Sequence, residues 1–108
     1  MKTYLYSISR KDIPLAQQTV QACHAAIEYT RVFMLESHPS YIHLTIKNKN
    51  QLEQLRQRLN DAGIPTAEFH EPYMDWGLTA IACILTEEQR HLTKGLQLWR
   101  LPTQGEVA

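Results

Sequence analysis

Hydrophobic and polar residues alternate in two segments of the chain, which is typical of strands that bury one face. Residues 3–10 read TYLYSISR and residues 41–47 read YIHLTIK, so both segments are predicted to be strands. Residues 64–70 predict a short third strand. Residues 78–85, LTAIACIL, are nearly all apolar, and this pattern predicts a fourth strand at the centre of a sheet.

A helical repeat follows the first strand. The turn KDIP supplies Asp12 as a helix cap and Pro14 as a first-turn residue, and the helix is predicted to continue to about Leu35. Apolar residues recur along it at steps of four, three and four, so they form one stripe that is predicted to face the sheet. The stripe consists of Ala16, Val20, Cys23 and Ile27.

Two further helices are predicted. The second follows the strand at 41–47, with Asn48 or Asn50 as its cap and Gly63 as the residue that ends it. A third, short helix begins after Thr86, which can cap it. The buried stripe of the second helix consists of Leu52, Leu55 and Leu59.

These elements predict one α/β domain over residues 1–108, in the order β-α-β-α-β-β-α. The two crossover helices imply parallel neighbouring strands. The loop between the third and fourth strands is too short for a crossover, so one strand is expected to run antiparallel. The result is a four-stranded mixed sheet between helices, with a tail that frays from about residue 101.

The composition fits a globular protein, because 44% of the residues are hydrophobic and 20% are charged. The formal net charge is zero. The chain therefore lacks the overall basic field of many nucleic-acid binders, although a local basic patch stays open.

Two observations predict a cytoplasmic protein. No segment approaches the roughly 20 apolar residues of a membrane span, and the N-terminus has no apolar run of signal-peptide length. Cys23 and Cys83 form no CxxC pair. We interpret them as two buried thiols in a reducing compartment.

A polar stripe also runs along the first helix, at the same steps of four, three and four residues. It consists of Gln17, Gln21, His24 and Glu28. Small residues flank His24, so another backbone or a ligand can approach it. The alternative is a solvated helix face with paired side chains. We expect no metal site, because His24 and Glu28 alone supply too few ligands.

A second candidate region is the loop HEPYMDWGLT, residues 70–79. It gathers acids, aromatic rings and a histidine between two strands, and loops at strand ends often form sites. The alternative is an ordinary exposed loop, in which the Thr79 hydroxyl simply faces a backbone group.

The segment SRKDIPLAQQTVQACHAAIEY resembles the first signature of the type 2 peptidyl-tRNA hydrolases. In that family a strand ending in Arg-x-Asp precedes a helix that carries Gln and His-Ala. The segments AGIPTAEFHEP and LTAIACI resemble the second half of the family, and the element order is similar throughout residues 3–95. The matching residues of the first signature are Arg10, Asp12, Gln21, His24 and Ala25.

The chain departs from the family pattern at two places. Family members carry Gly-Lys ahead of the Gln, with a functional lysine, whereas this chain has Ala16 and Gln17. The family's Asp-Ala-Gly-x-Thr loop is replaced by residues 71–77. Glu71 is the best match for the aspartate, and Thr79 stands for a family threonine, as in a divergent bacterial branch.

The resemblance implies hydrolysis of the ester between a peptide and tRNA, without a metal or a cofactor. Such a reaction needs a positioned water and donors for the carbonyl oxygen. Glu71 is expected to hold His24 or the water, and Thr79 and Gln21 to supply hydrogen bonds. The approach of the tRNA 3′ end is expected to be lined by Arg10, Lys11 and Gln17.

Two other functions stay open at this stage. A protein with this fold that has lost catalysis with the lysine would act as a binding or regulatory module. A different small hydrolase or transferase could use the same cleft. The expected partners are peptidyl-tRNA, bound weakly because eleven basic residues are matched by eleven acids, and a second copy of the chain. Self-association is expected through Leu96, Leu98 and Trp99.

Overall fold

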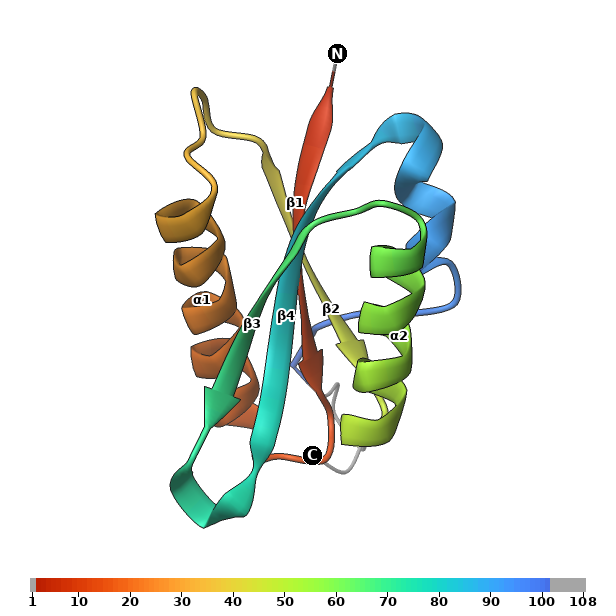
Figure 1. Ribbon diagram of the computed structural model, residues 1–108. Coiled ribbons are helices and arrows are strands. Elements are labelled where there is room, and N and C mark those ends of the chain that lie inside the picture. Colours follow the sequence, from red (N-terminus) through yellow and green to blue (C-terminus); the bar gives the residue numbers. More distant parts are fainter. Residues whose placement is uncertain (1, 102–108) are drawn as a thin grey trace.

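The computed structural model describes residues 2–101 and shows one mixed sheet between two layers of helix (Figure 1). The predicted fraying concerns residues 102–108, which lie outside the described range. The elements are β1 (Thr3–Arg10), α1 (Leu15–Val32), β2 (Ser40–Ile46), α2 (Lys49–Asp61), β3 (Thr66–Glu71), the 3₁₀ turn η1 (Tyr73–Asp75), β4 (Gly77–Thr86), the 3₁₀ helix η2 (Glu87–Thr93) and β5 (Gln97–Leu98).

The sheet has the strand order β3-β4-β1-β2-β5. β1 and β2 are parallel neighbours, while β4 is antiparallel to both β1 and β3, as the loop lengths predict. The predicted count of four strands is wrong, because β5 adds a fifth at the β2 edge. With two residues, β5 is too short to show an alternating pattern. It is extended by one further bond from Trp99 N to His43 O, at 2.8 Å.

The layer under α2 is a conventional hydrophobic core. Leu52, Leu55 and Leu59 have no exposed surface, which confirms the predicted stripe. They pack against large apolar residues of the sheet, namely Tyr6, Ile8, Leu44, Ile46, Ile81, Cys83 and Leu85. Burial of this many large side chains supplies most of the hydrophobic stabilisation of the fold.

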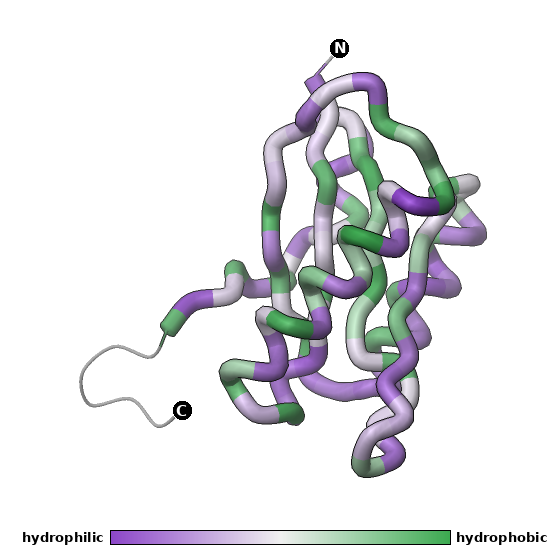
Figure 2. The backbone as a smooth tube through the Cα atoms, turned by 90° about the vertical axis from the view of Figure 1, so that its left-hand side faces the viewer, coloured by the Kyte–Doolittle hydropathy of each residue, from purple (hydrophilic) through white to green (hydrophobic). Residues whose placement is uncertain are grey.

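The layer under α1 combines alanines with larger side chains such as Leu5, Tyr29 and Phe69, and here the predicted apolar stripe is wrong. Ala16 and Cys23 are exposed, as are 42% of Val20 and 56% of Ile27. Figure 2, seen from the α1 side, shows hydrophobic segments alternating with hydrophilic ones along this helix. The residues that face the sheet are Gln18, Gln21, Ala22, Ala25 and Tyr29.

Hydrogen bonds satisfy polar side chains that are buried between α1 and the sheet. The Gln18 side chain donates to the carbonyls of Lys11 and Ile13, at 3.2 and 2.9 Å. The Ser7 hydroxyl donates to Ala22 O, at 2.9 Å. A buried polar group costs little once it is hydrogen-bonded, so Gln18 and Ser7 can lie between α1 and the sheet.

The helix ends agree with the predictions at most positions. Asn48 caps α2 by accepting from Gln51 N at 2.9 Å, and Thr86 forms a capping box with Gln89. Gly63, with φ +79°, follows the end of α2. The predicted cap Asp12 is wrong for α1, because Pro14 occupies that position and Asp12 instead pairs with Arg10.

The topology gathers several termini at one end of the sheet. β1, β2 and β3 all end there, both helices α1 and α2 begin there, and the connection from β3 to β4 closes that end (Figure 1). The carboxyl ends of parallel strands are where α/β sheets place their ligand sites. Both sequence regions singled out for chemistry therefore meet at this end.

Candidate functional site

A chain of hydrogen bonds joins three of the predicted site residues. The Thr79 hydroxyl donates to Gln21 Oε1 at 2.7 Å, and Gln21 Nε2 donates to Glu71 Oε1 at 3.2 Å. Thr79 and Gln21 have no exposed surface, whereas Glu71 is half-buried. The two buried residues therefore fix the position of one carboxylate oxygen at the surface.

A β-bulge points Thr79 towards Gln21. In the register of β3 and β4, Phe69 pairs with Ala80 and His70 pairs with Leu78, so Thr79 is left without a partner. The extra residue puts the side chains of Thr79 and Ala80 on the α1 face in succession. Bulges of this kind occur beside functional sites, where they redirect a side chain.

Glu71 lines an open cavity of about 510 Å³ at the end of the sheet. The other lining residues are His70, Pro72, Asp75 and Gly77. Within the cavity wall, Glu71 and Asp75 supply two carboxylates, and Glu71 has one oxygen bonded to Gln21. A carboxylate with one fixed oxygen can accept a proton from a water molecule or a hydroxyl group on the other.

Arg10 fastens the connection between β3 and β4. Its guanidinium forms a bidentate pair with Asp12, at 2.8 and 3.0 Å, and donates to the carbonyls of Trp76 and Leu78. Only 8% of Arg10 is exposed. These bonds use most of the five donors of the guanidinium, so Arg10 acts as a clamp on the loop.

His24 lies near the hydrogen bonds that join Thr79, Gln21 and Glu71 but takes no part in them. Its imidazole stacks on the Phe69 ring, with the centroids 4.4 Å apart. Phe69 and Glu71 belong to the same strand, so the imidazole lies along the strand that carries the carboxylate. The structure gives no hydrogen bond between His24 and Glu71 within residues 2–101.

The remaining predicted site residues lie around this centre. Gln17 Oε1 accepts from Gln21 Nε2 at 3.4 Å, which brings Gln17 to the same amide as Glu71. Lys11 is turned the other way, because its ammonium bonds Gln97 Oε1 at the β5 edge. The structure thus brings Gln17, Gln21, Glu71 and Thr79 together, with His24 next to them and Lys11 apart.

Sequence reasoning missed a second polar pair, on β1 and β2. Ser9 Oγ lies 2.7 Å from His43 Nε2, and the His43 ring stacks on Trp99 with centroids 5.6 Å apart. Burial lowers the pKa of the His43 imidazole to about 4. The alternation in both strands places these side chains on one face, but only the strand register brings them into contact.

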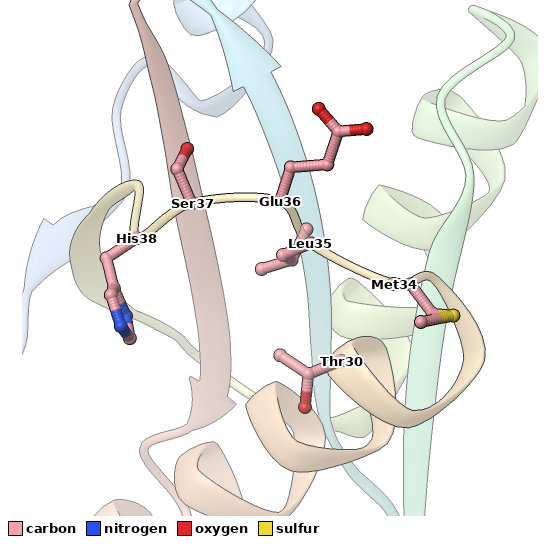
Figure 3. Close-up of a pocket in the computed structure, with 6 residues that line it drawn as sticks. All are labelled: Thr30, Met34, Leu35, Glu36, Ser37 and His38. Carbon is pink, nitrogen blue, oxygen red and sulfur yellow. The ribbon is translucent and has the colours of Figure 1, made fainter.

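The structure has cavities elsewhere, away from the bond chain of Thr79, Gln21 and Glu71. A cavity of about 660 Å³ lies beside η2, where Arg90 is bonded to Tyr6 and Glu87. Another, of about 380 Å³, lies at the end of α1. Figure 3 shows Glu36 and Ser37 pointing to one side of that loop and His38 to the other. Size alone therefore does not select the site.

Residues 2–101 lack two further features. Among residues 2–101, no group of three or more His, Cys, Asp or Glu side chains is placed to hold a metal ion. Over the same part of the chain, no helix is long and apolar enough to cross a membrane.

Two of the three residues predicted to form a dimer surface pack partly against other residues of the same chain. Trp99 is half-buried against His43, and Leu96 is half-buried at the η2 cavity. Leu98 is 66% exposed. Self-association through these residues stays a prediction.

Comparisons with known proteins reveal the fold alone. No family model matches the chain, and no curated protein matches it either. A solved structure of a protein of unknown function from Agrobacterium tumefaciens, Atu0240, is similar with a TM-score of 0.71 and 13% sequence identity. The match covers 91% of this chain and 98% of that one. The chain therefore has a small single-domain α/β fold, and nearly the whole of the Agrobacterium protein has a similar fold.

Proposed function

We propose that this protein hydrolyses the ester bond between a peptide and tRNA, at the cavity that Glu71 lines. The observation that carries the proposal is the bond chain from Thr79 through Gln21 to Glu71. It joins three of the residues that the resemblance to type 2 peptidyl-tRNA hydrolases selects, although they lie on three different elements.

In the proposed reaction Glu71 is the general base. Its carboxylate takes a proton from a water molecule, and the water oxygen attacks the ester carbonyl carbon. The tetrahedral intermediate then loses the ribose oxygen, which takes a proton from His24. Glu71 and the carboxylic acid product each release a proton to solvent, and His24 takes one back. The products are a peptide carboxylate and a tRNA with a free hydroxyl.

Gln21 and Thr79 hold the base and do not touch the substrate, because both are fully buried. The Thr79 hydroxyl fixes Gln21 Oε1, which leaves the amide NH₂ facing Glu71. The resulting order keeps Glu71 aligned before the substrate binds. Alignment of this kind lowers the barrier of a hydrolysis step.

His24 is the available proton donor for the leaving oxygen. Its imidazole is held by the Phe69 stack and forms no hydrogen bond with another of the residues 2–101. His24→Gln should therefore lower kcat by less than Glu71→Gln does, since water can replace a general acid more readily than an aligned base.

The first test is hydrolysis of an N-acetylaminoacyl-tRNA by the parent and by Glu71→Gln. The variant keeps the shape of the side chain and removes the base, so kcat should fall by about 10²–10⁴-fold. The matched control is Glu68→Gln, on the same strand. The Glu68 carboxylate pairs with Arg56 at 2.7 Å and with the His70 imidazole at 2.9 Å. The amide oxygen of a glutamine can still accept from both, so this variant should retain parental activity.

Equal activity in Glu71→Gln and the parent would end the proposal. An inactive parent that still binds the substrate would favour the alternative of a binding or regulatory module. Gln17, where the related family has lysine, is the feature that favours that alternative. Recovery of hydrolysis in Gln17→Lys would show that catalysis decayed with the lysine, because residue 17 lies beside the Gln21 amide.

A further inference from the structure

The cavity wall and the proposed substrate both carry negative charge, and the inference from this rests on the proposed function. The wall of the candidate cavity carries the carboxylates of Glu71 and Asp75, and the proposed substrate is a polyanion. Like charges repel at short range. The site therefore needs a cation that is close to the cavity and free to contact a phosphate.

Two cations at this end of the sheet are already engaged. The Arg10 guanidinium is bonded to Asp12 and to two carbonyls of the β3–β4 connection. The Lys11 ammonium is bonded to Gln97 at the far edge. Neither can turn to the cavity without breaking these bonds.

Lys49, the first residue of α2, lies against the cavity wall. Its side chain covers Gly77, and a Cβ atom at Gly77 would lie 3.0 Å from Lys49 Nζ and 3.3 Å from Lys49 Cε. Gly77 lines the cavity and pairs with Glu71 across the two strands. Within residues 2–101 the Lys49 ammonium has no hydrogen bond or ion pair.

We propose that Lys49 is the phosphate contact of this site and positions the 3′ end of the RNA strand beside Glu71. The lysine stem is long and flexible, and its ammonium binds phosphate as a point charge. The absence of a side chain at Gly77 lets the ammonium reach the cavity rim. Lys49 is thus a positioning residue, outside the bond-breaking step.

The test uses Lys49→Met, which keeps the length of the stem and removes the charge. Binding of N-acetylaminoacyl-tRNA is measured in the Glu71→Gln background, so that the substrate survives. The affinity should fall about fivefold at low salt, as expected for one screened charge pair. The slope of log affinity against log salt should become shallower by about 0.7, the value for one contact with a single strand.

Lys47→Met is the matched control. Lys47 lies two residues earlier and lines a different cavity, shared with Lys11 and Gln97, so its salt slope should equal the parental one. In the active background, Lys49→Met should raise KM about fivefold and leave kcat within about twofold. Lys49→Arg, which keeps the charge, should restore the parental KM.

Separate outcomes decide the two proposals. If Glu71→Gln abolishes hydrolysis while Lys49→Met changes neither KM nor the salt slope, the Lys49 proposal is wrong and the function stands. If neither the parent nor Glu71→Gln hydrolyses the substrate while Lys49→Met alone weakens binding, the proposed activity is wrong and Lys49 stands as an RNA contact. Equal effects of Lys47→Met and Lys49→Met indicate a general field, which overturns the specific contact.

Discussion

The two helices cover opposite faces of one sheet with different chemistry. α2 places Leu52, Leu55 and Leu59 against large apolar side chains. α1 places two alanines and two glutamines against a face that includes Ala67, Ala80 and Ala82. The α2 layer is held by burial of large apolar side chains, whereas the α1 layer combines a smaller apolar cluster with buried hydrogen bonds.

The α2 layer mainly stabilises the fold, whereas the α1 layer carries the candidate site. A leucine layer tolerates no polar group without a partner, because an unpaired buried donor or acceptor is costly. The α1 layer already contains paired amides and hydroxyls. Gln21 can therefore pass from the interior to Glu71 at the surface without an unsatisfied atom.

The largest expected effect comes from truncating the leucine layer. Leu55→Ala should lower the free energy of unfolding by about 2–5 kcal/mol, because it leaves a cavity in a closed core. The same reduction on the exposed side of α1, in Val20→Ala, should change that free energy by no more than about 0.5 kcal/mol. Urea unfolding measures both. Similar losses in the two variants would remove the distinction between the layers.

A smaller effect tests the hydrogen-bonded α1 layer. Thr79→Val leaves the buried Gln21 Oε1 without its donor and should cost about 1–3 kcal/mol of the free energy of unfolding. Adding Gln21→Leu removes the orphaned amide, so the double variant should lose less than the sum of the two single variants. Strict additivity would show that the two side chains are not coupled.

The smallest effect is a pH dependence on the same side of the sheet. Burial lowers the pKa of His43 to about 4, below the usual value of 6.5. The unfolded chain therefore takes up a proton first as the pH falls, and this part of the stability is lost between about pH 6.5 and pH 4.

His43→Gln should remove this pH dependence, which we expect to be about 1 kcal/mol after solvent screening. The measurement is the difference in the free energy of unfolding between the parent and His43→Gln at pH 7.5 and at pH 4.5. A difference that stays constant across this range would contradict the lowered pKa of His43.

Much of the fold could be predicted because its signals are local. The alternation in β1 and β2, the leucine stripe of α2 and the caps Asn48 and Thr86 each depend on a few neighbouring residues. β5 could not be predicted in this way. Its two residues are a strand only because the β2 edge supplies hydrogen-bond partners.

The phase of α1 shows where the local signal failed. Its apolar stripe and its polar stripe have the same spacing, so periodicity predicts a helix and leaves its rotation undecided. The positions of the larger apolar residues indicated the wrong face of α1 as the buried one. The sheet beneath α1 presents Ala67, Ala80, Ala82 and Ser7 beside Leu5, Phe69 and Ile84. The side of α1 that carries alanines and bonded glutamines packs on this surface.

The sequence by itself determined the order of the elements from β1 to η2, the α2 core and the identity of the candidate site residues, because these follow from neighbours in the chain. Only the tertiary structure decided which of those residues meet. The bulge at Thr79 and the rotation of α1 bring Gln21 to Glu71, and the bonds of Arg10 remove its guanidinium from the approach. These contacts join distant segments, and no local pattern encodes the packing that aligns them.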